Sequence, residues 1–261
     1  FSKVSVGATE NTIMAATLAD GETIIENSAM EPEIDDLINV LNKMGAKISR
    51  VKNKTIKIIG VRKLSGFNHI IMPDRIEAGT YAIAAAITGG RVELLDAPVN
   101  NLESVIKFLK KMGVNITIYP DGMLVDAPEK LNNFDLITEV YPGFPSDLQA
   151  QAMALMSVSK GISTIEEKIF ENRFMHVSEL LRFGAEIHVK GSKAIIKGNK
   201  ILTSAQVMAT DLRASSSLVL AALRAEGDTV INRVYHLDRG YEDMEKKLSA
   251  CGAYIKRVRS N

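Results

Sequence analysis

The sequence is poor in the residues that support several common kinds of site. It holds a single cysteine, Cys251, among 261 residues, which excludes an internal disulfide framework and predicts a reducing, cytoplasmic location. Its four histidines lack the spacing of metal ligands, so a metal site is not expected. The Gly-x-Ser-x-Gly elbow and the glycine-rich phosphate and dinucleotide loops are missing too. We therefore expect neither a metal nor an organic cofactor.

Excess charge and long apolar runs are also lacking. The formal net charge is +1, which provides no field for nucleic acid or an anionic membrane surface, so neither is expected as a partner. The longest apolar stretches, such as residues 81–87, are too short to cross a bilayer. With 46% hydrophobic residues the chain can still bury a substantial core, in one large or two modest domains. Any anion-binding site must therefore be local.

What the sequence does contain is an internal repeat, present in four copies. A glycine after a charged segment recurs at Gly45, Gly113, Gly184 and Gly252, with spacings of 68, 71 and 68 residues. A second glycine turn recurs in the same order, at positions 21, 89, 161 and 227. Self-similarity at a fixed period predicts repeated structural units, here of about 68 residues.

The residue pattern within each copy predicts an apolar helix, a strand, a charged helix and a strand hairpin. We therefore expect an α/β protein. The alanine-rich helices, apolar on nearly all sides and expected to be buried, span 13–19, 81–87, 148–155 and 217–223. The charged helices, expected on a surface, span 33–44, 103–112, 177–183 and 241–250. Strands are expected at 23–26, 92–95, 164–166 and 229–231, with hairpins at 116–125 and 187–196.

The two ends of the chain are less regular. Residues 2–6 have the pattern of the tail of a strand, and residues 254–258 of one hairpin strand whose partner is absent. The chain does not begin with Met and is expected to be a piece of a longer protein, whose missing N-terminal part would be its partner. Residues 67–261 are expected to form one lobe of three copies around a buried helix bundle. Residues 1–66 would be the last repeat of another lobe.

Polar residues concentrate at the start of the apolar and charged helices, and arginines recur among them. Helix N-termini carry unpaired N–H groups and partial positive charge, so several that converge form an anion site. Arg173, Arg213 and Arg239 would add forked donors suited to phosphates and carboxylates. A simpler interpretation exists for single residues: Asp147 could be only a helix N-cap, and Asp211 with Arg213 only a first-turn ion pair.

Six motifs lie at or near these clusters, in order along the chain: KVSVGAT at 3–9, PDRIE at 73–77, FPSD at 144–147, FENRFMH at 170–176, MATDLRAS at 208–215 and YHLDRGYE at 235–242. They are similar to motifs of the enolpyruvyl transferases, and among these to the branch that acts on UDP-N-acetylglucosamine. The resemblance covers roughly the last three fifths of the family's chain. It implies two lobes, each an inside-out α/β barrel of three repeats, with the substrates phosphoenolpyruvate and UDP-N-acetylglucosamine in the cleft between them.

The resemblance also implies roles for individual residues. Asp147 is similar to the carboxylate that faces the sugar 3-hydroxyl, the candidate general base, and Arg239 to a second catalytic residue. The group expected around the phosphate and carboxylate of phosphoenolpyruvate is Arg173, Asp211, Arg213 and Arg239. The group expected to bind the UDP-sugar is Lys3, Val4, Ser5, Val6, Gly7, Asp147, Ile169 and Phe170.

The implied reaction is the first committed step of peptidoglycan precursor synthesis, with release of phosphate. The family takes its proton donor from a cysteine on a mobile loop, with a nearby lysine, and this chain contains neither; Cys251 matches a different position. Residues 1–261 alone are therefore expected to be inactive. Two alternatives stay open: an enolpyruvyl transferase of the shikimate pathway, which shares fold and phosphoenolpyruvate, and a non-catalytic binding relative.

Overall fold

The computed structural model describes residues 1–198 and 201–258. The chain divides into two compact units, and each is described by itself: unit 1 comprises 1–73 with 140–143, and unit 2 comprises 74–139 with 144–261. The division falls in residues 60–74, a segment without helix or strand. Among the described residues, no helix is long and apolar enough to cross a membrane.

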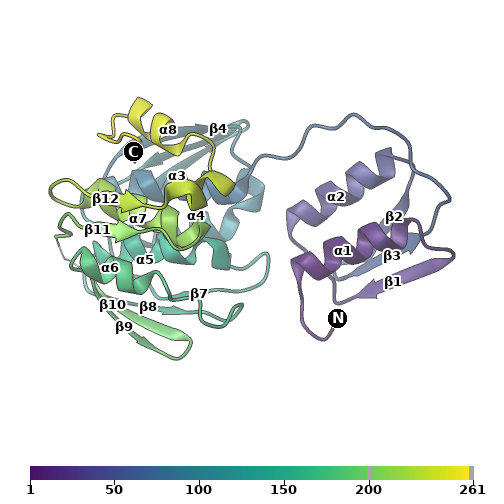
Figure 1. The fold of residues 1–261 in the computed structure, drawn as a ribbon, viewed down its shortest axis with the longest axis horizontal. Helices are drawn as coiled ribbons and strands as arrows, with labels where there is room; N and C mark the ends of the chain where they lie inside the picture. Colours follow the sequence, from purple (N-terminus) through teal and green to yellow (C-terminus); the bar gives the residue numbers. More distant parts are fainter. Residues whose placement is uncertain (199–200, 259–261) are drawn as a thin grey trace. The chain divides into compact units, whose positions relative to one another are not determined.

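Unit 1 contains the first copy of the repeat (Figure 1). Its elements are α1 (Val6–Thr17), β1 (Glu22–Glu26), α2 (Pro32–Lys43), β2 (Lys47–Lys52) and β3 (Thr55–Ile59). The strands form an antiparallel sheet in the order β1-β3-β2, and α1 and α2 pack on one another and on that sheet. A core of isoleucines, among them Ile13, Ile34 and Ile56, fills the space between the helices and the sheet.

Unit 2 contains the other three copies. Copy two comprises α3 (Arg75–Thr88), β4 (Arg91–Leu95), α4 (Glu103–Lys111), β5 (Asn115–Tyr119) and β6 (Gly122–Asp126). Copy three comprises β7 (Leu136–Ile137), α5 (Gln149–Ser157), β8 (Ile162–Glu166), α6 (Val177–Arg182), β9 (Glu186–Lys190) and β10 (Lys193–Lys197). Copy four comprises β11 (Gln206–Met208), α7 (Leu212–Arg224), β12 (Val230–Asn232) and α8 (Met244–Ala250). Short 3-10 helices are η1 (Val99–Asn101), η2 (Ser146–Leu148) and η3 (Val234–Arg239).

The repeat is visible in the strand order. In copies one to three the strand after the apolar helix pairs with the second hairpin strand, giving the orders β1-β3-β2, β4-β6-β5 and β8-β10-β9. The glycine markers share a conformation as well. Gly45, Gly113, Gly184 and Gly252 have φ between 83° and 100°, because each lies just beyond a charged helix where the chain turns through the left-handed region. The α/β class expected from the sequence is confirmed.

The apolar helices of unit 2 form its centre. Helices α3, α5 and α7 pack on one another, and all nine residues of α5 are buried. Small residues such as Ala82, Ala152 and Ala221 are fully covered, which lets the helix axes approach closely. Burial of these three helices is confirmed. In unit 1, α1 differs: it buries only four residues and leaves Met14 and Leu18 about half exposed, at 47% and 56%.

Three local expectations are wrong. Residues 2–6 are not the tail of a strand, because α1 begins at Val6 and the Ser5 side chain accepts a hydrogen bond from Ala8 N at 3.2 Å. Within the described chain, residues 254–258 form no strand, which fits the lack of a pairing partner. Helix α8 begins at Met244 rather than at 241, because Tyr241 is held outside it by buried contacts.

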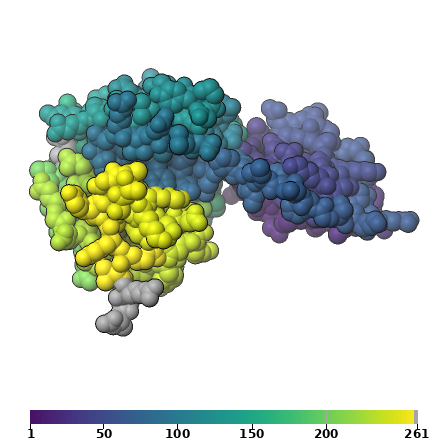
Figure 2. Space-filling view, turned by 90° about the horizontal axis from the view of Figure 1, so that it is seen from above, coloured from purple at the N-terminus to yellow at the C-terminus, as the bar shows by residue number. Residues whose placement is uncertain are grey.

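Those contacts join copies two, three and four. The Tyr241 hydroxyl lies 2.8 Å from Thr80 Oγ1 on α3, and the Gln151 amide on α5 donates to both oxygens, at 3.2 and 3.3 Å. On the surface nearby, Lys247 of α8 pairs with Glu77 of α3 at 2.7 Å. Figure 2 shows the corresponding blue and yellow surfaces of copies two and four side by side.

Replacing Tyr241 with phenylalanine is expected to destabilise unit 2 by about 1–3 kcal/mol, because it leaves the Gln151 amide short of an acceptor in a buried place. Denaturant unfolding of the wild-type and variant proteins measures this difference. The matched control is Tyr254→Phe, which removes the same hydroxyl from a fully exposed ring and is expected to change little. Equal stability of Tyr241→Phe and Tyr254→Phe would contradict the role given to this buried network.

Candidate active site

The chemically notable feature of unit 2 is a carboxylate held between two arginines. Asp147 Oδ1 accepts a hydrogen bond from Arg173 Nη2 at 2.7 Å and another from Arg213 Nε at 2.5 Å. Asp147 lies in η2 at the start of α5, Arg173 in the loop before α6, and Arg213 in the first turn of α7. The starts of three helices from two copies therefore meet at one carboxylate.

The three charged groups of this cluster shift one another's pKa values in different directions. Burial would raise the pKa of Asp147, but the hydrogen bond and charge of Arg213, with a smaller contribution from Arg173, hold that pKa below its usual 3.8. Burial also opposes the charge on Arg213, yet its contacts with Asp147 outweigh burial and raise its pKa. For Arg173, burial and repulsion by Arg213 prevail and lower its pKa. Asp147 and its two arginines together carry one net positive charge, and the Glu167 and Asp211 carboxylates lie close enough to act on Arg173 and Arg213.

The N-cap interpretation of Asp147 is wrong. The residue preceding η2 is Pro145 and that preceding α5 is Leu148, and neither helix start has a side-chain cap. The Asp147 carboxylate is directed to the arginines instead, 26 and 66 residues away in the sequence. A local pattern of small polar residues before a helix could not distinguish these outcomes.

Asp211 does act as a cap. Its Oδ1 accepts hydrogen bonds from Arg213 N at 2.9 Å and Ala214 N at 3.0 Å, which fixes the first turn of α7. The expected first-turn ion pair with the Arg213 side chain is replaced by the pair with Asp147. Asp211 thus orients the backbone from which the Arg213 guanidinium reaches the carboxylate.

The loop between β8 and α6 places two further candidates, Phe170 and Ile169, and ends at His176. Phe170 is half exposed, and the Arg173 guanidinium lies over its ring at 4.6 Å from the centroid, a cation–π arrangement. Ile169 beside it is half-buried. His176 is almost wholly buried at the start of α6. The arginine is therefore restrained by an aromatic face on one side and a carboxylate on the other.

The remaining candidates are Arg239 in unit 2 and a short segment of unit 1. Arg239 ends η3 and is exposed, and among the described residues no ion pair joins it to Asp147. Lys3, Val4, Ser5, Val6 and Gly7 belong to unit 1, where Lys3 is exposed and Ser5 caps α1. A side chain added at Gly7 would meet open space, so packing within unit 1 does not require glycine there.

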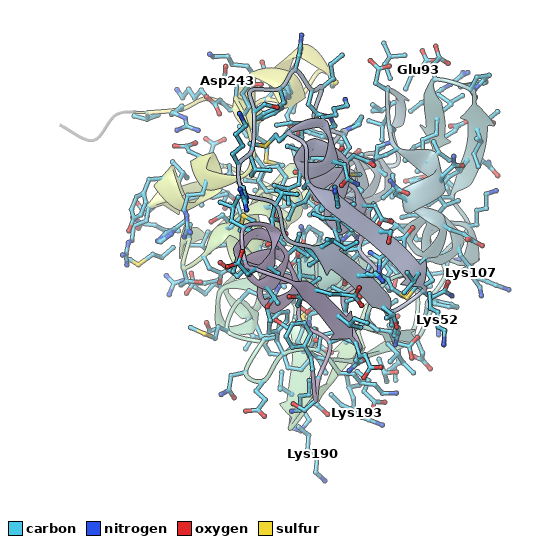
Figure 3. All side chains as sticks on the ribbon, turned by 90° about the vertical axis from the view of Figure 1, so that its right-hand side faces the viewer. Lys52, Glu93, Lys107, Lys190, Lys193 and Asp243 are labelled. Carbon is cyan, nitrogen blue, oxygen red and sulfur yellow. The ribbon has the colours of Figure 1, made fainter. Side chains whose placement is uncertain are left out.

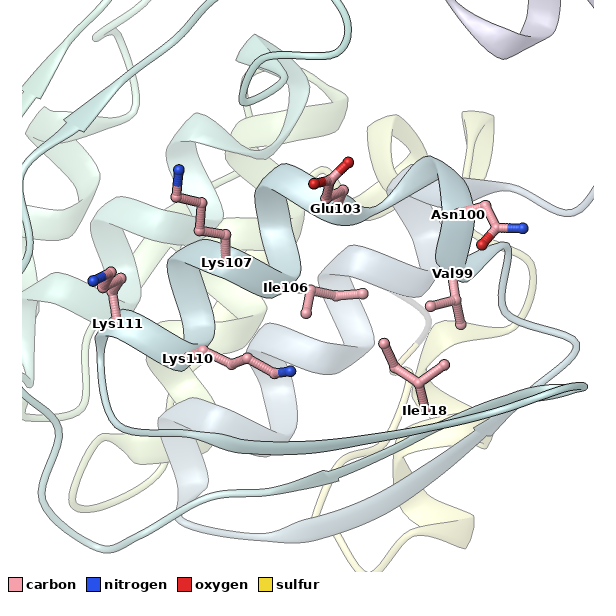
Figure 4. Close-up of a pocket in the computed structure, with 8 residues that line it drawn as sticks. All are labelled: Val99, Asn100, Glu103, Ile106, Lys107, Lys110, Lys111 and Ile118. Carbon is pink, nitrogen blue, oxygen red and sulfur yellow. The ribbon is translucent and has the colours of Figure 1, made fainter.

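The sequence pattern missed one residue of this region, Glu167. It is buried and receives hydrogen bonds from both the segment before Asp147 and the loop that carries Arg173. The only signal was a second glutamate directly after the strand at 164–166. A hollow elsewhere, on α4 and β5, is lined by Val99, Asn100, Glu103, Ile106, Lys107, Lys110, Lys111 and Ile118 (Figure 4), and includes no member of the Asp147 cluster.

Comparison with known proteins places the chain in a family. The family model described as EPSP synthase (3-phosphoshikimate 1-carboxyvinyltransferase) matches residues 1–248. The chain belongs to this family. Expected membership of the enolpyruvyl transferases is thereby confirmed.

Relatives of this EPSP synthase family chain include two proteins named UDP-N-acetylglucosamine 1-carboxyvinyltransferase. The one from Paramagnetospirillum magneticum is 58% identical over 260 residues, covering 99% of this chain and 60% of the relative. The one from Geobacter metallireducens is 54% identical over 259 residues, covering 99% and 62%. The chain thus spans about three fifths of the length of these relatives.

Solved structures of the family share the fold. The enolpyruvyl transferase NikO from Streptomyces tendae aligns with a TM-score of 0.87 and 26% identity, covering 96% of this chain and 60% of NikO. EPSP synthase from Acinetobacter baumannii aligns with a TM-score of 0.74 and 19% identity, covering 98% and 62%, and at that identity supports the fold alone.

Proposed function

We propose that the full-length protein transfers the enolpyruvyl group of phosphoenolpyruvate to the 3-hydroxyl of UDP-N-acetylglucosamine and releases phosphate. The observation that carries this proposal is the Asp147 carboxylate held by Arg173 and Arg213, in a chain more than half identical to transferases of that name. A carboxylate base next to fixed positive charge is what this reaction requires from its protein.

Each group has a part in the proposed chemistry. The methylene carbon of phosphoenolpyruvate accepts a proton, the sugar oxygen forms a bond to the neighbouring carbon, and Asp147 accepts the hydroxyl proton. The resulting tetrahedral intermediate then loses phosphate and one proton of the newly formed methyl group, which restores the carbon–carbon double bond. Arg173 and Arg213 would bind the phosphate or carboxylate throughout, and Arg239 would join them there. Asp211 keeps Arg213 in place through the α7 backbone.

The arginines also couple binding to base strength in this scheme. The hydrogen bonds from Arg213 and Arg173 lower the pKa of Asp147 and so make it a weak base. An anionic group that takes over some of these N–H donors would weaken that hold and raise the pKa of Asp147. The base would thus become effective only when the anionic substrate is bound.

The UDP-sugar is assigned to two parts of the chain. We propose that Lys3, Val4, Ser5, Val6 and Gly7 hold the diphosphate, with exposed Lys3 as the charged group. Ile169 and Phe170 would contact the nucleotide, since Phe170 offers a half-exposed ring. Residues 1–66 would be the last repeat of the first lobe and residues 67–261 the second lobe, each lobe an inside-out barrel. Inactivity of residues 1–261 alone and a cytoplasmic location stay predictions.

Calorimetry on the full-length protein tests the choice of substrate. UDP-N-acetylglucosamine is expected to bind, and phosphoenolpyruvate to bind more tightly in its presence. Binding of shikimate 3-phosphate without any heat from the UDP-sugar would move the protein to the shikimate branch. Binding of both proposed substrates without turnover would instead support a non-catalytic relative.

A further inference from the structure

Glu167 joins the two segments that carry the facing charges of the candidate site. Its side chain is only 4% exposed, and its two oxygens have different partners. Oε2 accepts a hydrogen bond from Ser146 Oγ at 2.8 Å, and Oε1 accepts from the backbone of Ile169 at 2.8 Å and of Phe170 at 3.1 Å. Burying a carboxylate without hydrogen-bond partners is energetically costly. The carboxylate therefore holds the Ser146 hydroxyl and the Ile169 and Phe170 backbone N–H groups in place.

The first of these segments is the turn that holds Asp147. Ser146 is buried and directly precedes Asp147 in η2, and Leu148 follows it with no exposed surface. Leu148 is packed so closely against Gly79 that a side chain there would meet Leu148 Cδ1 at 2.5 Å. The turn is thus anchored on its apolar side by Leu148 and on its polar side by the bond from Ser146 to Glu167.

The second segment is the loop that holds Arg173. The backbone bonds from Ile169 and Phe170 to Glu167 fix its beginning, and Lys168 N donates to the buried Thr138 hydroxyl at 3.0 Å. The Arg173 guanidinium then lies over the Phe170 ring, 4.6 Å from its centroid. The negative charge of Glu167 also acts on Arg173 directly.

We propose that Glu167 is a positioning residue, which sets the separation of Asp147 from Arg173 by holding the turn with one oxygen and the loop with the other. Glu167 acts on the proposed substrate groups indirectly: its hydrogen bonds hold Ser146 on one side and Phe170 on the other, and its charge supports Arg173. The expected effect of Glu167 on catalysis rests on the proposed function. Its expected effect on the positions of the turn and the loop rests on the hydrogen bonds alone.

The test is Glu167→Gln in the full-length protein, because the amide keeps the shape but has one acceptor oxygen where the carboxylate has two. We expect kcat to fall about 10–100-fold, because small misplacements of reacting groups are costly. We also expect the acid limb of the kcat/KM profile, which reports the free enzyme, to move to higher pH, because Asp147 is held less firmly by Arg173. Ser146→Ala removes one of the three hydrogen bonds to Glu167. It is expected to change kcat and the acid limb of the pH profile in the same directions, by smaller amounts.

The matched control is Glu166→Gln at the preceding residue. Glu166 pairs at 3.2 Å with Lys193, whose side chain extends outward at the β9–β10 turn (Figure 3). Loss of such an exposed pair is expected to change kcat less than twofold. A general loss of folding would abolish the cooperative thermal transition, whereas loss of these hydrogen bonds alone would leave that transition in place at a lower midpoint.

Hydrogen exchange tests the positioning role of Glu167 independently of the proposed function. In Glu167→Gln, the amides of Ile169 and Phe170 are expected to exchange at least about tenfold faster while those of α5 do not change. A wild-type protein without turnover would refute the proposed function, and the exchange rates would still decide the role of Glu167. Unchanged exchange in the variant, or a wild-type kcat and pH profile, would overturn the positioning role.

Discussion

Replacing Asp147 with asparagine in the full-length protein is expected to lower turnover by about 10²–10⁴-fold, the range for a lost general base. The amide cannot take the proton of the sugar hydroxyl, although it has nearly the same shape. It still presents one oxygen to Arg173 and Arg213, so substrate binding is expected to change less than kcat. Steady-state rates at saturating phosphoenolpyruvate and UDP-N-acetylglucosamine measure the effect.

The matched control is Asp35→Asn in unit 1. Asp35 Oδ1 accepts two hydrogen bonds from Arg50, at 2.8 and 2.9 Å, so the same change is made in another aspartate–arginine pair. That pair is partly exposed, and its loss is expected to cost at most about 1 kcal/mol of stability and no turnover. Near-normal turnover of Asp147→Asn would remove Asp147 from the mechanism.

The stability of the Asp147 variant should depend on pH in a defined direction. The pKa of Asp147 is lower in the folded protein than its ordinary value of 3.8, so the ionised carboxylate stabilises the fold. That contribution is complete above the ordinary pKa and is lost as the pH falls through the lower, folded value. The wild type is therefore expected to lose its advantage over Asp147→Asn only in acid below about pH 4.

Local patterns were sufficient for the repeat and for most of its elements. The glycines at 45, 113, 184 and 252 mark left-handed turns after charged helices, a conformation that favours glycine strongly enough to be visible in one sequence. Helix α4 occupies 103–111 where 103–112 was expected, and the β5–β6 hairpin turns between 119 and 122 as its Pro-Asp-Gly sequence indicates. Such features depend on residues a few positions apart.

Partners distant in the sequence were not predictable. Asp147 has the local appearance of an N-cap, and only the approach of residues 173 and 213 gives its carboxylate another partner. Tyr241 was placed inside a helix because its contact with Thr80 spans 161 residues. Glu167 went unnoticed because nothing local shows that Ser146 lies opposite it. Side-chain hydrogen bonds between residues distant in the sequence decide the site, and the repeat pattern alone does not specify them.

The wild-type protein is expected to lose about 3 kcal/mol of stability between pH 6.5 and pH 4 through His176 alone. Burial, reinforced by the charge of Arg173, lowers the pKa of His176 from 6.5 to about 4 despite the nearby Asp211 carboxylate. In this pH interval the His176 ring therefore binds a proton in the unfolded chain but stays neutral in the folded one. Stability is complete above the unfolded value and declines as the pH falls toward the folded one.

Urea unfolding of the wild type and of His176→Gln at several pH values measures this contribution. The variant lacks the titrating ring, so the difference in unfolding free energy between the two proteins should change by about 3 kcal/mol from pH 7 to pH 4. Because the comparison concerns a change with pH, a constant cost of repacking the buried site does not affect it. His188→Gln, on the exposed face of β9, is the control and should follow the wild type. Parallel pH profiles of wild type and His176→Gln would show that His176 is already accessible to protons in the folded state, and that the base of the Arg173 loop is open to water.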